Sequence, residues 1–596
     1  MSKILNNKES GGVLVISLVV ILVVAGLVGV AMQTTSTTSR LTDSSRDLSA
    51  LQSAAEGALD FAYGVWSKTT NTNFRPMTTS ELTNALSITP SFSGFAYDTS
   101  GNDGPLSLMA VDSLGAKVSN PIGVTVSLDN YPGWRGTSYS YLASVRLTSI
   151  FGGRKVNYGV KRNIQISIAP LFQATAFFEG DLELYKTAPM IISGLIHTNS
   201  TAYVSGMTTT SMTITGNLSY VTGYQDSAAP PYADTWSGYT PNSALPPNYP
   251  NGYSNQVNQV KRMEPLGTDT ASTLDKTDSN PNNDSMRELI EPPDNNYSDP
   301  SAIANRRFYN KAGIVIRTSG TGTTITTQNG TSLNSSQQTA LAAAITHQSF
   351  YDFREGKTMG VSTLDISQAN TVLNAANGFN GVLYIDDASS TGYADPKAIR
   401  LKNGGVLPTN GLTVASQNPI YIQGDYNTGT TSSSTSVPAN ATGNPSNTDS
   451  PTVAGYSKVS SAVIGDAVTI LSNNWSDSNS SNSLSSRVAS NTTVNTAIVA
   501  GFVPSGWTNE FGTQYGYSGG LNNFPRFLET WSGKSFTYFG SMVELFTSQI
   551  ATGEWDTGNI YVPPNRCWNF DSNFTTNAPP GSLTAVSLSR GPLVRF

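Results

Sequence analysis

A run of 20 densely apolar residues, Val13 to Met32, constrains the fold of this chain more than any other feature. It lies within 30 consecutive uncharged residues that end at Ser39. A helix rises about 1.5 Å per residue, so this run would span about 30 Å, which is the hydrocarbon thickness of a bilayer. The segment can therefore cross a membrane. Removal as an ordinary secretory signal remains an alternative, because Gly29-Val30-Ala31 is a passable cleavage site.

The sequence that follows the apolar run gives the helix no reason to stop at a membrane surface. Residues 33–66 contain no proline, and their first glycine is Gly57. Apolar residues recur there at steps of seven, three and four, which places them on one stripe of a helix. The members of this stripe are Leu41, Leu48, Leu51, Ala55, Ala58, Ala62 and Val65. We predict one helix over 12–66, either as an anchor with a helical spacer or as a subunit whose stripe packs against neighbouring helices.

The N-terminal region also carries a short leader with two lysines, a glycine pair before the apolar helix, and the sequence QSAAEGALDFA at 52–62. In these features it resembles type IV pilin-like proteins, specifically the PilX minor-pilin group, with Ala54, Ala55 and Glu56 as the shared motif. The resemblance covers residues 1–66. It implies that a prepilin peptidase removes a leader of residues 1–11 by cleaving after Gly11, with cleavage after Gly12 as the alternative. It also implies that the retained helix packs against other pilins or pseudopilins in a filament.

One position departs from the pattern of major pilins. These carry a glutamate at the fifth mature position, where this chain has Ile16 or Ser17, depending on the cleavage site. A carboxylate in lipid is costly unless it is paired, so its absence eases insertion and removes one docking contact. The departure favours a minor, initiating or tip-like subunit over a repeating shaft subunit.

Beyond Trp66 the sequence changes to short alternating segments, such as 122–128, 140–150 and 155–168. This alternation is typical of half-buried strands. We predict a mainly β ectodomain, parallel β-helix-like or a β-sandwich, with a first β-rich region at 67–206 and a second at 306–596. Whether the β region is one domain or two stays open.

Other segments are predicted to lack strands. Residues 207–305 are rich in Pro, Asn and Asp and are interpreted as a surface excursion, and 428–458 as a disordered loop. Residues 335–353 are predicted to form a helix that starts at a serine. Asp275, Asp278 and Asp284 resemble a calcium loop only superficially, because the required glycine and spacing are missing. No metal site is predicted, although calcium binding stays open.

Composition narrows the classes of partner. Only 12% of the residues are charged, the net charge is −6, and no block of Lys and Arg occurs, so nucleic acid is not an expected partner. Cys567 is the only cysteine, which forbids an intrachain disulfide. It is either a buried inert residue or a thiol activated by Arg566.

The sequence shows no nucleophile elbow, phosphate loop, zinc motif or dinucleotide fingerprint. His197 is interpreted as a packing residue, because no second ligand lies at a suitable spacing. Paired carboxylates would be the main alternative for an enzyme, and the candidates are Asp386, Asp387, Asp425, Asp466 and Asp477. Adjacent residues of a strand point to opposite faces, so Asp386 and Asp387 cannot act as a pair. We predict that the chain is not an enzyme and uses no cofactor.

These observations together predict a minor pilin-like subunit of a type IV pilus or a type II secretion-like filament. It would sit in the bacterial inner membrane by one helix, with the ectodomain outside the cytoplasm, at the cell surface or in the pilus, for assembly or adhesion to a surface ligand. The alternative is a membrane-tethered carbohydrate-binding or carbohydrate-cleaving β protein outside any filament. In that case Trp531, Tyr538 and Trp568 would be exposed stacking platforms rather than packing residues.

Overall fold

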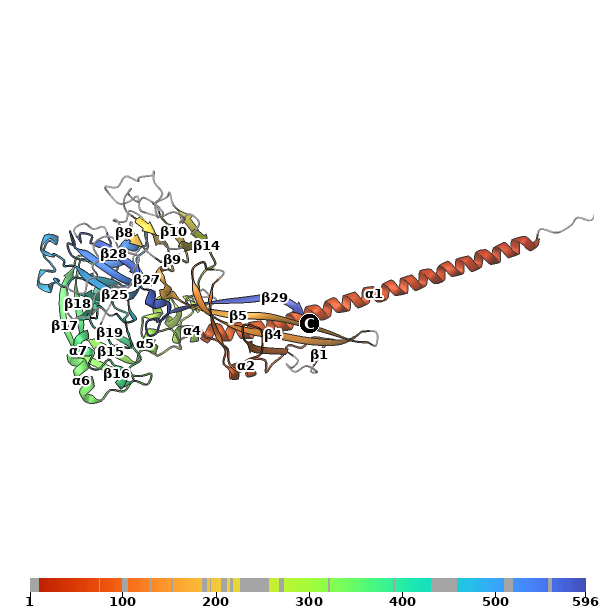
Figure 1. Cartoon of the computed structure of the whole chain (residues 1–596), viewed down its shortest axis with the longest axis horizontal. Coiled ribbons are helices and arrows are strands. Elements are labelled where there is room, and N and C mark those ends of the chain that lie inside the picture. The colour runs from red at the N-terminus through yellow and green to blue at the C-terminus, as the bar shows by residue number, and fades with distance from the viewer. Residues whose placement is uncertain are drawn as a thin grey trace, which may run out of the picture.

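The computed structural model shows a chain drawn out along one axis (Figure 1), with a long helix at one end and a large β unit at the other. We call residues 171–583 the head, and residues 10–170 with 584–596 the stalk unit. The prediction of a long N-terminal helix followed by a mainly β ectodomain is confirmed. The structure describes residues 10–596 except 74, 99–105, 129–130, 152–153, 185–189, 193, 205–211, 215–217, 226–256, 267–272, 320–321, 390–391, 430–457, 509–517 and 556–559.

The N-terminal helix α1 (Ser10–Asn73) is seven residues longer at its C-terminal end than predicted. It ends just before Arg75-Pro76, because the residue that precedes a proline is disfavoured in a helix. A short helix, α2 (Thr79–Asn84), follows at once. It begins with a capping box, in which Thr78 and Glu81 satisfy each other's backbone N–H groups.

Beside the C-terminal half of α1 lies a six-stranded antiparallel sheet, which we call the stalk sheet. Its long central strands β4 and β5 pair from Thr137 and Ile168 to Phe151 and Arg154, and the C-terminal strand β29 adds to the free edge of β5. The head is therefore inserted between β5 and β29. The strands are β1 (Ala96–Tyr97), β2 (Leu106–Val111), β3 (Gly123–Ser127), β4 (Arg135–Phe151), β5 (Arg154–Pro170) and β29 (Thr584–Arg595).

The predicted first β-rich region, 67–206, includes the point where the stalk unit ends and the head begins. The structure changes unit at Pro170, where β5 ends, and β6 (Ala174–Phe178) already pairs with strands of the head. All five residues of β6 are buried, whereas β5 contains both buried and more exposed residues.

In the head, successive strands alternate between two parallel sheets. From β19 to β27 each odd-numbered strand joins a 12-stranded sheet and each even-numbered strand joins a six-stranded sheet. The chain thus winds in stacked coils, with both sheets buried on their facing sides. The strands of this series are β19 (Val382–Asp387), β20 (Lys397–Lys402), β21 (Leu412–Ala415), β22 (Ile420–Gln423), β23 (Ser461–Gly465), β24 (Val468–Leu471), β25 (Thr492–Phe502), β26 (Pro525–Phe527) and β27 (Ser535–Thr547).

Aliphatic residues in register hold the coils together. One ladder runs across nine strands of the large sheet, and all of its members are fully buried. The ladder comprises Ile314, Leu383, Val414, Val463, Ile498, Met542, Ala176, Ile196 and Leu218.

The remaining elements extend or close this core. Some strands continue the 12-stranded or the six-stranded sheet, five short strands form two small parallel sheets of their own, and α6 covers the end of the coil beside β16 and β17. They are β7 (Leu182–Glu183), β8 (Met190–Ile192), β9 (Leu195–Thr198), β10 (Thr201–Tyr203), β11 (Met212–Ile214), β12 (Leu218–Tyr220), β13 (Gly223–Gln225), β14 (Val257–Gln259), α4 (Ser301–Ala304), α5 (Phe308–Lys311), β15 (Ile314–Ser319), β16 (Gly322–Thr327), α6 (Ser335–Ala343), β17 (Ile345–Asp352), β18 (Lys357–Asp365), α7 (Ile366–Ala369) and β28 (Asn565–Phe570).

Two predicted segments differ from the structure. The predicted helix at 335–353 ends at Ala343, and its second half is β17, which pairs antiparallel with β18. The helix begins at Ser335, as predicted, and its N-cap is Asn334. The predicted surface excursion is also wrong at its C-terminal end, because Leu289, Ile290 and Ile303 are buried against the outer face of the large sheet. The predicted disordered loop falls almost entirely on 430–457, outside the described residues.

Candidate functional site: the two halves of the N-terminal helix

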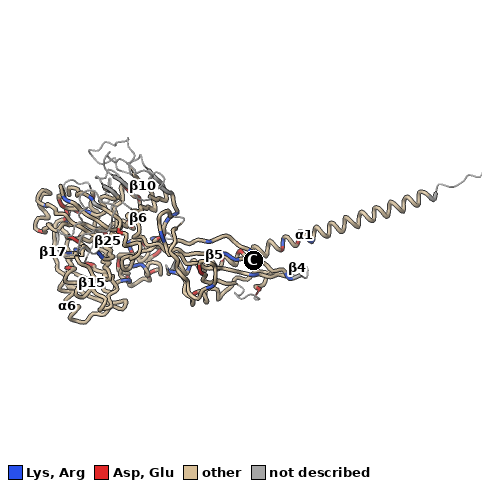
Figure 2. Tube along the Cα trace, viewed as in Figure 1, with Lys and Arg blue, Asp and Glu red and all other residues tan. Residues whose placement is uncertain are grey.

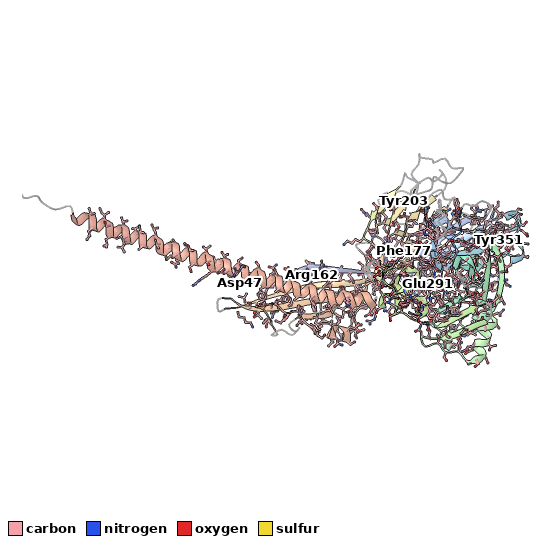
Figure 3. All side chains as sticks on the ribbon, turned by 180° about the vertical axis from the view of Figure 1, so that it is seen from behind. Asp47, Arg162, Phe177, Tyr203, Glu291 and Tyr351 are labelled. Carbon is pink, nitrogen blue, oxygen red and sulfur yellow. The ribbon has the colours of Figure 1, made fainter. Side chains whose placement is uncertain are left out.

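The N-terminal half of α1 has no packing partner among the described residues. Large apolar side chains from Val13 to Met32 are between 47% and 74% exposed. On the N-terminal side of Asp47 the helix extends alone, and its side chains point away from the ribbon in all directions (Figure 3). This part of α1 is long and apolar enough to span a membrane. An apolar surface of this size requires a lipid or protein environment.

The C-terminal half of α1 packs against the stalk sheet of the same chain. Leu51, Ala55, Ala58 and Ala62 are fully buried there. The prediction that the whole stripe packs against neighbouring helices is therefore wrong for these four residues. Small alanine side chains let the helix backbone approach the sheet closely.

The ends of the predicted stripe behave differently from its centre. Leu41 is 67% exposed and Leu48 is 36% exposed, so these two remain available to a partner. Val65 is half-buried, and the position that fills the core is its neighbour Trp66. The periodicity could have identified Trp66, because it lies four residues after Ala62.

Trp66 and an ion pair fix the helix on the sheet. The Trp66 ring meets Tyr141 of β4 edge to face, with 5.6 Å between the ring centroids. About four turns before the end of the helix, Asp60 pairs with Arg162 of β5 at 3.0 Å and approaches Arg590 of β29 at 3.7 Å. The carboxylate of Asp60 thus connects α1 to two strands that are far apart in sequence. Neither Asp60 nor Arg162 was singled out in the sequence, because nothing local predicts their contact.

The predicted family motif lies at the start of this contact. Ala54 and Ala55 are buried against the sheet, whereas Glu56 is half-exposed and accepts a hydrogen bond from Gln52 Nε2 at 2.9 Å. In this chain the two alanines therefore act in packing within the subunit.

The predicted processing site lies at the free end of α1. Gly11 and Gly12 are the second and third residues of the helix, and a Cβ on Gly12 would meet no atom within 4 Å. Nearby, Ser17 directs its hydroxyl back to the carbonyl of Val13 at 2.8 Å, which satisfies its polar group inside an apolar surface. Both Ile16 and Ser17 are exposed.

The candidate catalytic carboxylates serve as structural anchors. Asp466 is fully buried and accepts hydrogen bonds from the backbone N–H groups of Gln549, Ile550 and Ala551, and from Arg287. Asp477 pairs with Arg400 at 2.7 Å.

Asp386 and Asp387 point to opposite faces of β19, as the alternation of a strand requires. Asp386 pairs with Arg317 at 3.0 Å, and burial raises the pKa of this carboxyl. Asp387 is directed toward Ser362 of the other sheet. Burial also raises the pKa of Asp425, to about 6. The described structure brings no two of the five candidates into a shared water-accessible site.

His197 forms a buried polar network at the junction between the head and the stalk unit. Its Nε2 donates to Asn199 Oδ1 at 2.9 Å, because the Asn199 amide nitrogen is committed to Glu179 and to the Met263 carbonyl. Nδ1 then accepts from the Ser219 hydroxyl at 2.8 Å. Complete burial lowers the pKa of His197 to about 4, so the ring is neutral and structural.

The candidate sugar-stacking aromatics lie inside the head. Trp531, Tyr538 and Trp568 are fully buried and contact one another through Phe536. They are packing residues and not binding platforms. The side chain of Cys567 lies outside the described residues.

Two of the three aspartates that superficially resemble a calcium loop cap local turns. Asp275 and Asp278 accept hydrogen bonds from Thr277 and Asn280 in local turns. Among the described residues, no group of three His, Cys, Asp or Glu side chains could hold a metal ion.

Comparison with known proteins adds little to this description. No protein-family model matches the sequence, and no curated protein matches it. Among solved structures, the competence-associated pilin ComZ from Thermus thermophilus is similar over 92% of this chain and 98% of its own, with 11% sequence identity and a TM-score of 0.26. A similarity of this size does not establish a shared fold.

Proposed function

We propose that the chain is a minor pilin-like subunit of a type IV pilus or a type II secretion-like filament. The observation that carries this proposal is the division of α1 into an exposed apolar half and a half that packs against the stalk sheet. One continuous helix can then hold the subunit in the inner membrane and later insert among the helices of other pilins, without any change in the ectodomain.

Mechanical continuity supports the same proposal. The fixed half of α1 is held by Trp66 and by Asp60, which contacts both β5 and the C-terminal strand β29. Because the head is inserted between β5 and β29, a force on the exposed half reaches the head through paired strands. The head would thus be displayed outside the cytoplasm for assembly or adhesion.

The proposal also covers removal of the leader and the position of the subunit in the filament. A prepilin peptidase would cleave after Gly11 or Gly12, at the accessible end of α1. The absence of a glutamate at Ile16 or Ser17 supports a minor rather than a shaft position, since a buried carboxylate would otherwise require a partner.

We also propose that the chain is not an enzyme. Three of the five candidate carboxylates, Asp386, Asp466 and Asp477, are paired with arginines. The alternative is a carbohydrate-binding protein outside a filament. The aromatic residues that would stack on a sugar in that case are buried, so they do not support it.

Mass spectrometry of the mature N-terminus tests the proposed function. We expect the chain purified from its native membrane to begin at Gly12 or Val13, because the peptidase cleaves after Gly11 or Gly12. A Gly11→Leu/Gly12→Leu variant should keep its leader. Gly26→Leu, a matched change in the same exposed helix with open space around the new Cβ, should be processed normally. An unmodified chain that begins at Met1 or Met32 would refute the proposal.

A further inference from the structure

The charges of this protein are separated along its long axis. The head, residues 171–583, contains 19 basic and 30 acidic residues, a formal net charge of −11. The rest of the chain contains 15 basic and 10 acidic residues, a net charge of +5. The small total charge of −6 therefore conceals two units of opposite sign.

The positive charge is concentrated on the stalk sheet. Its six strands carry eight basic residues and no Asp or Glu. Blue positions follow β4 and β5 in Figure 2. The basic residues are Arg135, Arg146, Arg154, Lys155, Lys161, Arg162, Arg590 and Arg595.

These cations divide between the two faces of the sheet. Arg162 points toward α1, where it pairs with Asp60. Since side chains alternate along a strand, Lys155 and Lys161 of β5 lie on the opposite, outer face. Arg146 joins them, because it is paired in register with Gly159. No ion pair with a described carboxylate neutralises Arg146, Lys155 or Lys161.

The outer face is hollowed as well as basic. An open groove of about 560 Å³ lies between the turn that carries Leu114 and the irregular part of β29 at Gly591-Pro592. Lys161, Asn163 and Gln165 line it, and its described lining includes no Asp or Glu. The Phe596 ring lies 5.1 and 5.7 Å from the charged groups of Arg146 and Lys161, so both cations contact it through cation–π interactions.

We infer that this basic outer face of the stalk sheet docks the acidic head of a second copy of the chain, displaced along the long axis. This inference rests on the proposed function, because two inserted helices would hold neighbouring subunits side by side. Two copies at equal height would place head against head and stalk against stalk, with like charges facing. A displacement of one copy brings units of opposite sign together. Such a contact joins different surfaces of the two copies, which is the type of contact that builds open filaments.

A bilayer is too distant to be the partner of this face. Arg162 meets Asp60, which lies 28 residues after Met32, so the centre of the face is about 42 Å along the helix from the apolar run. Charges are screened over about 8 Å at physiological ionic strength.

Sedimentation of the full chain in a neutral detergent tests the inference. We expect association at about 50 mM salt that weakens about tenfold or more at about 500 mM salt, because exposed charges are screened. Lys155→Glu/Lys161→Glu should abolish this salt-sensitive association, and Lys155→Gln/Lys161→Gln should weaken it. The matched control Lys402→Glu/Lys534→Glu makes the same change of charge on the head and should leave association intact or strengthen it.

The outcomes separate this inference from the proposed function. Association through the apolar helices is not weakened by salt, so salt-insensitive oligomers would overturn the docking surface and leave the helix role standing. A chain that stays monomeric at both salt concentrations, or loses association equally in the control variant, would also overturn the inference. Binding of added phosphatidylglycerol that depends on Lys155 and Lys161, without association of copies, would assign the face to lipid instead.

Discussion

Replacement of Leu22 and Val23 by lysine is expected to remove the protein from the membrane. Both residues lie at the centre of the exposed apolar half of α1 and are 65% and 55% exposed. A lysine at the centre of a membrane-spanning helix costs about 2.5 to 3.5 kcal/mol on insertion scales, so the pair costs about 6 kcal/mol. We expect the carbonate-resistant fraction of Leu22→Lys/Val23→Lys to fall by more than tenfold.

Thr38→Lys/Ser39→Lys provides the matched control. It adds the same charge to the same helix, beyond the apolar run and at exposed positions. These lysines would lie in water, so membrane association should be unchanged. If carbonate extracts both double variants from the membrane to the same extent, the apolar half of α1 does not hold the protein in the membrane.

The second large effect is expected at Asp466. Its carboxylate is fully buried and accepts from three backbone N–H groups and from Arg287, which is itself 5% exposed. Asp466→Ala leaves the three N–H groups without this acceptor and removes the buried carboxylate that Arg287 contacts. Among the described residues, this guanidinium then keeps only Glu291 and the Gln417 carbonyl. Breaking a buried pair costs about 3 to 5 kcal/mol, and the unpaired N–H groups add to this. We expect the free energy of unfolding of the head to fall by about 5 kcal/mol or more.

Tryptophan fluorescence during urea unfolding measures this change. Asp395→Ala removes one member of the exposed pair with Lys397, and it should change the free energy of unfolding by about 1 kcal/mol at most. A loss of similar size in both variants would show that Asp466 is not an anchor. Retained stability of Asp466→Ala would reopen the question of a chemical role for this residue.

The helix could be predicted because its signals are local. Apolar residues from Val13 to Met32 and the absence of proline before Pro76 require no knowledge of the rest of the chain. The alternation in 140–150 and 155–168 is equally local, and it correctly placed the two longest strands of the stalk sheet.

The sequence does not determine which helices and strands of the chain pack against one another. The stripe from Leu51 to Ala62 could pack against a neighbouring helix or against a sheet equally well, and in the structure it packs against the stalk sheet. The pairing of β29 with β5 joins residues more than 400 positions apart, so no periodicity indicates that the chain returns to the stalk. Residues 281–305 look like a surface segment because they are polar, yet Arg287 reaches Asp466 in the core.

The basic outer face of the stalk sheet could not be predicted from the sequence for the same reason. The sequence contains no block of basic residues, which argued correctly against a contiguous basic motif. Lys155, Lys161 and Arg146 share one face only because β4 and β5 pair in a particular register. A surface assembled from separate strands has no linear signature, and the overall charge of −6 hides it.

The central claim is that the exposed half of α1 is covered by lipid or by other helices in the native assembly. Labelling single cysteines with a membrane-impermeant maleimide tests it directly, in a Cys567→Ser background. Val20→Cys and Val24→Cys should be protected in native membranes and filaments and should react after denaturation, whereas Ser45→Cys, on the exposed stalk of the same helix, should react at once. Equal labelling at all three positions in the native state would contradict the account.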